Sequence, residues 1–163
     1  MDEELVNTKN RLHKFLEEEI SLFFEKSRFD ANPEITIKNV SQIILWVCAL
    51  DEFYKKSDGD NYSNFLKGKS SSEILKGVRY ARNRAIHQFT QLLYISAGAE
   101  LPATLPFPLF EIRWKSVNEL PSPDKGYKNK ELENHYLTHL ENKAVKYTFE
   151  SLKVLFEQIK LEI

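Results

Sequence analysis

The stretch 79-RYARNRAIHQ-88 places three arginines, an asparagine and a histidine inside an apolar helical pattern. Apolar residues recur at steps of three and four residues, which predicts one buried stripe of a helix: Ile74, Val78, Ala81, Ala85, Phe89 and Leu92. At about 100° per residue, His87 projects roughly opposite to Val78, and Asn83 lies one turn before it. We therefore expect the protein core to cover the apolar face, and a second copy of the chain, or RNA, to cover the face with His87.

The rest of the chain predicts further long helices with the same kind of apolar stripe. Helix-breaking and capping signals set their limits, including Asn32-Pro33 after the first helix. Gly77 lies inside the central helix, where it can allow a bend or a close approach of another element. The expected elements are helices at about 3–28, 33–56 (or from Thr36), 72–96 and 129–161 (or from Asn134), with a connector or short helix at 62–68.

The segment 98–129 interrupts this helical pattern, because its prolines disfavour helix. Within it, 110-FEIRWKSV-117 alternates apolar and polar residues with period two, which predicts an extended segment or a hairpin strand. We expect an ordered flap laid over the bundle. The alternative is an aromatic lid that stacks RNA bases beside the active cleft. The fold class is thus all-α, one domain over 1–163, with about four long helices and a proline-containing insertion at 98–129 before the last helix.

Composition indicates a soluble globular protein, with 42% hydrophobic and 29% charged residues and a net charge of −1. The single cysteine, Cys48, excludes an intramolecular disulfide and fits a reducing compartment, and we expect it to be buried. With no leader pattern and no long apolar run, we expect a cytoplasmic protein without a membrane span. Between Lys67 and Arg84 six basic residues face one acid, Glu73, which suggests a phosphate site of limited extent or simply a solvated helix face.

Asp51 interrupts the apolar stripe of the second helix near its centre. A buried carboxylate is costly unless it is paired or hydrogen-bonded. We predict Arg82 of the central helix as its partner. The alternatives are that Asp51 lies at a frayed helix end or pairs with another base.

The pattern Arg82-Asn83-x-x-x-His87 resembles the Arg-x(4–6)-His signature of the HEPN superfamily, including the polar residue that often follows the arginine. The resemblance covers most of the chain except the 98–129 insertion. It implies a HEPN-like helical bundle that forms a homodimer. Many members are metal-independent ribonucleases that act as toxins or in antiviral defence, under the control of an antitoxin or a neighbouring defence protein. Others are scaffolds without nuclease activity.

The resemblance implies cleavage of RNA by attack of a ribose 2′-hydroxyl on the adjacent phosphorus. His87 would take or give a proton, Arg82 would stabilise the charge developing on the phosphate, and Asn83 would orient either group. A dimer would supply the second histidine, so that neither a metal nor another cofactor is required. The other expected contributors are Arg79 and Arg84 as auxiliary phosphate contacts and Asp51 as a supporting residue. The rival interpretation is a non-catalytic dimeric module that binds a protein partner or a nucleotide.

The remaining histidines suggest a third interpretation. His135 and His139 stand one turn apart on the last predicted helix, with Glu131 one turn earlier, and such a group could hold a metal in a metal-dependent enzyme. Because no further ligand is evident from the sequence, a solvated histidine pair is the simpler expectation. His13 lies among charged residues of the first helix, where we expect it on the surface.

Overall fold

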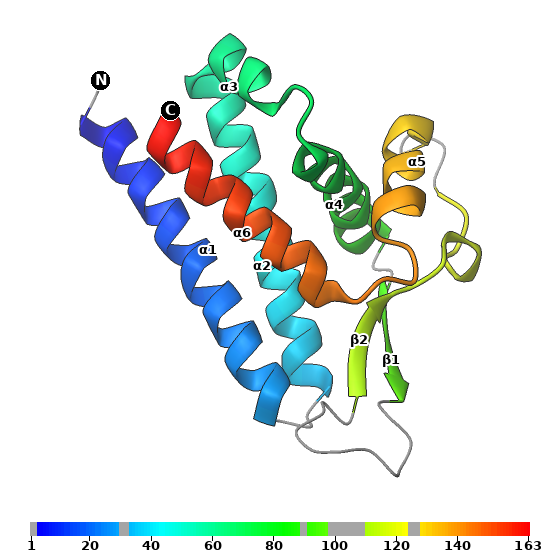
Figure 1. Ribbon diagram of the computed structural model, residues 1–163. Helices are drawn as coiled ribbons and strands as arrows, with labels where there is room; N and C mark the ends of the chain where they lie inside the picture. Colours follow the sequence, from blue (N-terminus) through cyan, green and yellow to red (C-terminus); the bar gives the residue numbers. More distant parts are fainter. Residues whose placement is uncertain (1–2, 30–32, 89–90, 98–109, 124–127) are drawn as a thin grey trace.

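The computed structural model describes residues 3–29, 33–88, 91–97, 110–123 and 128–163. Two long helices form its first layer, α1 (Glu3–Phe29) and α2 (Pro33–Ser57), and the C-terminal helix α6 (Val145–Glu162) packs beside α1 (Figure 1). The helix α4 (Ser70–Gln88) lies against α2, α5 and α6. The described residues thus form a mostly helical fold, as predicted, and none of their helices is long and apolar enough to cross a membrane.

The core lies where α1, α2, α4 and α6 meet, and its apolar residues follow the helical stripes expected from the sequence. Val78 and Ala81 of α4 are fully buried, so the motif helix turns its apolar face inward as predicted. Cys48 is also buried and unpaired, as expected. The other helices contribute buried aromatic and aliphatic side chains, among them Tyr54, Tyr62, Tyr136, Phe149, Phe156, Ile20, Ile43 and Leu50.

The central helix is shorter than predicted. It ends at Gln88 rather than near Ser96, and residues 93–97 form strand β1 (Leu93–Ala97), antiparallel to β2 (Phe110–Trp114). Leu92 and Leu93 are buried here, as they would be if the helix continued. Their apolar character therefore does not distinguish a helix from a strand. Pairing with β2 makes residues 93–97 a strand rather than a helix. The non-helical region therefore begins before residue 93 rather than at residue 98.

The predicted hairpin strand is confirmed as β2, which packs on the bundle as an ordered element. Trp114 is fully buried, and its indole N–H donates to Thr148 Oγ1 at 2.9 Å. A tryptophan buried in this way cannot stack on an RNA base. The lid alternative would otherwise depend on residues 98–109, which lie outside the described residues. A 3₁₀ turn, η1 (Val117–Glu119), follows β2.

The last predicted helix is in fact two helices, α5 (Lys130–His139) and α6. Asn142 between them has φ 58°, and its backbone N–H donates to the carbonyl oxygen of Trp114 at 3.0 Å. Trp114 N–H in turn donates to Lys143 O at 3.1 Å. The helix is therefore broken because this turn pairs with the end of β2. The described residues contain six α-helices: the four expected long ones, the last of them divided in two, and the short helix α3 (Gly59–Leu66), where a connector or short helix was expected at 62–68.

Candidate functional site

The three arginines of the motif have different environments, although all lie within six residues of α4. Arg79 and Arg82 reach acidic residues of α2. Arg84, in contrast, is almost completely buried and contacts the segment that follows η1. The helix positions them in this way because its apolar stripe, which includes Val78 and Ala81, is held in the core. Their partners determine which of them is available to a ligand.

Asp51 is the centre of a buried ionic network, and its partner is Arg79 rather than the predicted Arg82. Arg79 Nε and Nη2 donate to the two carboxylate oxygens at 2.7 and 2.5 Å. Tyr62 Oη donates at 2.9 Å and Lys55 Nζ at 2.8 Å. The spacing of the apolar stripe could not distinguish Arg79 from Arg82, because they lie one turn apart and both side chains are long enough to reach α2.

Arg82 instead pairs with Glu52 at the surface of α2, where the carboxylate side chain is 52% exposed. Its guanidinium also lies beside the Cys48 thiol. Burial raises the pKa of Cys48 to about 11, although the positive charge of Arg82 opposes the shift. The thiol therefore stays protonated and is not a nucleophile at neutral pH.

Arg84 is only 2% exposed, so its guanidinium has no direct route to a ligand in solution. Its Nη2 donates to the carbonyl oxygen of Pro121, and its guanidinium lies 5.8 Å from the centre of the Tyr80 ring. In the described part of the chain, Arg84 Nε and Nη1 and Tyr80 Oη make no hydrogen bond. Arg84 thus tethers the segment after η1 to α4, and its predicted contact with phosphate stays a prediction.

His87 lies in the last turn of α4, and Asn83 lies one turn before it and is partly exposed. The backbone therefore places both on the helix that carries Arg82. The side chain of His87 lies outside the described residues, so its predicted role is untested, as is the role of Asn83.

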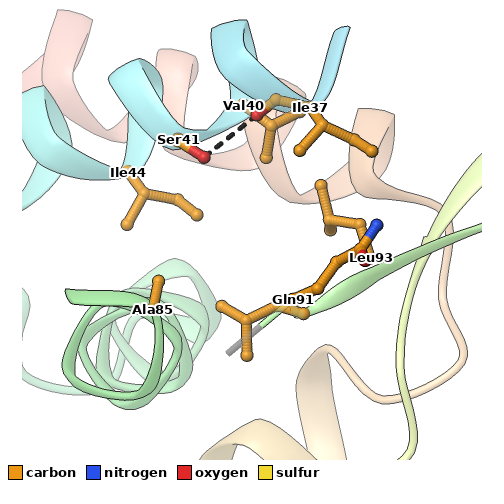
Figure 2. Close-up of a pocket in the computed structure, with 8 residues that line it drawn as sticks. Ile37, Val40, Ser41, Ile44, Ala85, Gln91 and Leu93 are labelled. Atoms are coloured by element: carbon orange, nitrogen blue, oxygen red, sulfur yellow. Dashed lines mark hydrogen bonds between the residues drawn. The ribbon is translucent and has the colours of Figure 1, made fainter. Parts of the chain in front are cut away.

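An apolar cavity of about 280 Å³ opens between α2, the C-terminal part of α4 and the start of β1 (Figure 2). Ala85 forms part of its wall, three residues after Arg82 and two before His87. Ser41 donates its hydroxyl to Ile37 O at 3.0 Å within its own helix, which leaves that wall largely apolar. The residues that line the cavity are Ile37, Val40, Ser41, Ile44, Ala85, Gln91, Leu92 and Leu93.

His13 is buried, contrary to the prediction that it lies on the surface. Its side chain is packed between α1, α2 and α6, with Nε2 2.7 Å from Tyr54 Oη. Burial lowers the pKa of His13 to about 4, and the positive charge of Lys160 contributes to the shift. The charged residues that flank it in the sequence point away, because only one face of α1 is buried.

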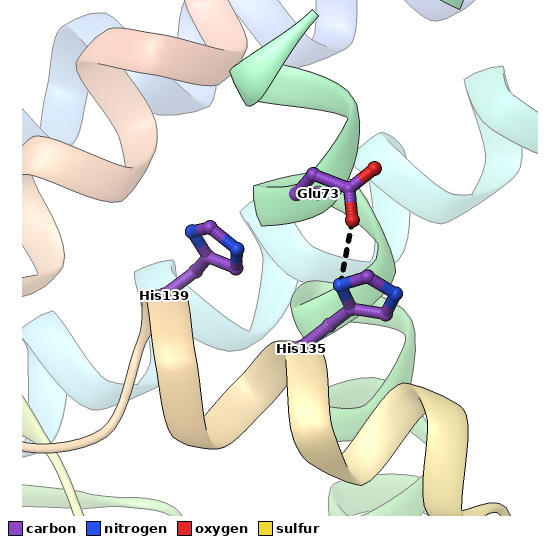
Figure 3. A group of neighbouring side chains, drawn as sticks. All are labelled: Glu73, His135 and His139. Atoms are coloured by element: carbon purple, nitrogen blue, oxygen red, sulfur yellow. Dashed lines mark ion pairs between the residues drawn. The ribbon is translucent and has the colours of Figure 1, made fainter. Parts of the chain in front are cut away.

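A second cluster of polar side chains joins α4 to α5. Glu73 from the first turn of α4 meets His135 and His139 of α5 (Figure 3). The two histidines were predicted from the sequence, but Glu73 was not, and it replaces Glu131 as the principal carboxylate beside them. Glu73 could not have been found from spacing along one helix, because it comes from another element.

These two clusters, Arg82 with its neighbours near the end of α4 and Glu73 with the two histidines near its start, are the candidate functional sites of the described residues. No family model, no curated protein and no solved structure matches this chain.

Proposed function

We propose that the chain is a metal-independent endoribonuclease that acts as a homodimer and cleaves RNA by 2′-hydroxyl attack. Its acting residues are Arg82, Asn83 and His87, which follow the pattern that resembles the HEPN signature. A role as a toxin or antiviral-defence effector, controlled by a cognate antitoxin or a neighbouring defence protein, belongs to the same proposal.

The observation that carries the proposal is the difference between the ion pairs of Arg79 and Arg82. Arg79 is held by a carboxylate that is 2% exposed, whereas the partner of Arg82 is 52% exposed. An exposed ion pair contributes little to stability, about 0–1 kcal/mol, so that an incoming phosphate can replace Glu52 at small cost. Arg82 is therefore the arginine of this helix suited to bind a phosphate, with the planar fork that favours bidentate contacts.

The reaction requires one base and one acid. One imidazole takes the proton of the 2′-hydroxyl as its oxygen bonds to phosphorus, and a second imidazole gives a proton to the 5′-oxygen as the P–O5′ bond breaks. The products are a 2′,3′-cyclic phosphate and a 5′-hydroxyl. Because each chain supplies one histidine in the motif, an isologous dimer with two copies of His87 in one cleft would supply both groups.

Arg82 would hold the non-bridging phosphate oxygens and stabilise their increasing negative charge. Asn83, one turn before His87, would orient the imidazole or the phosphate. Arg79 keeps the α2–α4 contact in place through Asp51 and, with Arg84 beneath the surface, adds positive potential. Ala85, which lines the apolar cavity, lies between Arg82 and His87 in the sequence.

The test is incubation of the purified protein with single-stranded RNA in excess EDTA, with analysis of the product ends. We expect cyclic phosphate ends for the parent protein. His87→Ala and Arg82→Ala should each lower the rate by about 100-fold or more, and Arg82→Lys should restore only part of it because lysine lacks the fork. Arg11→Ala, which removes an exposed charge on α1, is the matched control and should cleave normally.

Equal cleavage by the parent protein and His87→Ala would contradict the proposal, since both preparations would then share a contaminating nuclease. The thermal unfolding midpoint of each variant should match that of the parent. The alternative function is a non-catalytic dimeric module, and it is favoured by the fact that Arg79 and Arg82 already have acidic partners within the chain. It predicts no cleavage by the parent protein, with a weaker dimer in the same variants.

A further inference from the structure

The cluster of Glu73, His135 and His139 has the composition of a metal site and lies outside the proposed nuclease site. One ligand atom from each residue can be chosen so that all three lie within 4.8 Å of one another (Figure 3). Glu73 Oε2 is 2.8 Å from His135 Nδ1, and the two imidazole rings are stacked with centroids 6.2 Å apart. Donor atoms bound to one Zn²⁺ at about 2.0–2.1 Å lie about 3.3 Å apart, so small side-chain rotations would complete the site.

The convergence of these residues depends on the packing of α4 against α5. His135 and His139 share one face of α5 because they are four residues apart. Glu73 lies one turn before Gly77, where a Cβ atom would come 3.2 Å from His135 O and 3.3 Å from Tyr136 Cα. Gly77 therefore lets the two helix backbones approach closely, and this approach holds Glu73 over the histidine pair.

The donor set and its exposure fit a transition metal better than an alkaline-earth ion. Two imidazole nitrogens and one carboxylate oxygen are ligands that Zn²⁺ accepts in tetrahedral sites, with water in the fourth position, whereas Mg²⁺ and Ca²⁺ prefer oxygen ligands. The His135 and Glu73 side chains are 18% and 35% exposed, which leaves a path for an ion from solution.

Two positive charges oppose an ion at this position, because Lys143 acts on His139 and Lys76 lies beside Glu73. Lys76 Nζ lies 3.3 Å from Glu73 Oε1, and it lies 3.9 Å from Glu131 Oε1. The Glu131 side chain is 73% exposed and can take the ammonium group as Glu73 turns to the ion. Glu131 can therefore replace Glu73 as the partner of Lys76 when Glu73 binds the ion.

We propose that Glu73, His135 and His139 bind one Zn²⁺ ion, which joins the first turn of α4 to α5. This inference goes beyond the proposed nuclease function, in which no metal takes part. The ion would stabilise the position of α5, the helix that follows the β2 segment and packs most closely on α4.

The test uses the full chain, stripped with a chelator and dialysed, then titrated calorimetrically with Zn²⁺ and separately with Mg²⁺. We expect about one Zn²⁺ per chain, a higher thermal unfolding midpoint with Zn²⁺, and no comparable effect of Mg²⁺. Glu73→Gln, His135→Gln and His139→Gln should each weaken Zn²⁺ binding about tenfold or more and abolish the shift in the unfolding midpoint.

Two controls separate this site from the remaining histidines and acids. His87 is fourteen residues from Glu73 on the same helix, about 21 Å along its axis, so His87→Ala should bind Zn²⁺ like the parent chain. Glu157→Gln removes an exposed acid of α6 and should also leave binding unchanged. Absence of stoichiometric Zn²⁺ binding, or unchanged binding in all three ligand variants, would overturn the proposal. Neither result depends on RNA cleavage.

Discussion

The Asp51 side chain is 2% exposed, and donors from Tyr62, Arg79 and Lys55 surround its carboxylate. A buried charge is tolerated when its partners replace the lost hydration, and here both carboxylate oxygens accept hydrogen bonds. The network joins α2, α3 and α4, because its members come from all three helices. Asp51 is therefore a structural support for the helix that carries Arg82.

We predict that Asp51→Asn lowers the free energy of unfolding by about 3 kcal/mol, because Arg79 loses its ionised partner in a largely dehydrated position. Urea denaturation at neutral pH measures the change. Glu52→Gln on the same helix is the matched control, and it should cost less than about 0.5 kcal/mol because that ion pair is exposed. Equal losses of unfolding free energy in the two variants would show that the burial of Asp51 does not increase the contribution of its ion pair to stability.

His13 predicts a specific pH dependence of stability. Its pKa falls from 6.5 to about 4 on folding, because burial disfavours the charged imidazole and Lys160 adds to the shift. Between these values the unfolded chain binds a proton that the native chain does not, so stability rises with pH across this window. The contribution of neutral His13 is complete above about pH 6.5 and is lost as the pH falls towards about 4.

We expect the free energy of unfolding to fall by about 2 kcal/mol from this residue between about pH 7 and about pH 5. His13→Gln retains a polar group opposite Tyr54 Oη, but glutamine does not titrate. The free energy of unfolding of this variant should therefore change less between the two pH values, by the same amount. Urea denaturation of both proteins at the two pH values measures the difference. Parallel pH profiles would contradict the assignment.

At the scale of the elements, Gly77 lies where α4 and α5 approach each other closely. A Cβ atom at this position would lie 2.7 Å from Leu140 Cδ1, whose side chain can rotate, but also 3.2 Å from a backbone oxygen of α5. The two helices would have to separate to make room. The prediction that Gly77 permits a close approach is thus confirmed, with α5 as the neighbour.

Gly77→Ala should lower the free energy of unfolding by about 1 kcal/mol, the difference between a mid-range overpacking cost and the helix-propensity gain. Overpacking typically costs about 1–3 kcal/mol, which outweighs the helix-propensity gain of up to about 1 kcal/mol from alanine. Thermal or urea denaturation measures the net effect. Ser71→Ala at the start of the same helix is a control that removes a hydroxyl group away from this contact and should have a smaller effect. A stabilised Gly77→Ala protein would mean that α5 moves away freely.

At the scale of the whole molecule, the proposed nuclease requires two chains. Cleavage should therefore depend on assembly, because one motif histidine per chain supplies either the acid or the base but not both. We expect the chain to sediment as a dimer, and the specific activity per chain to fall on dilution below the dimer dissociation constant. Sedimentation velocity and rate measurements over the same concentration range test this. A monomer with constant specific activity would contradict the two-chain mechanism.

Local sequence patterns located most of the helical regions and the apolar stripe that each buries. Apolar stripes with helical spacing placed Val78 and Ala81 in the core, and alternation with period two identified the strand that contains Trp114. These predictions succeeded because each depends on neighbours within one or two turns of the same element. The buried Cys48 followed from the same pattern.

The tertiary structure alone decided which distant residues meet. It selected Arg79 rather than Arg82 for Asp51, brought Glu73 to the two histidines, buried His13, and ended helices where β1 and the Asn142 turn pair with β2. Each outcome depends on how elements far apart in the sequence pack together. Hydrophobic spacing specifies the face that a helix buries, but it does not specify the partner or the register of the contact, which are set by the fit of side chains and backbone hydrogen bonds across elements.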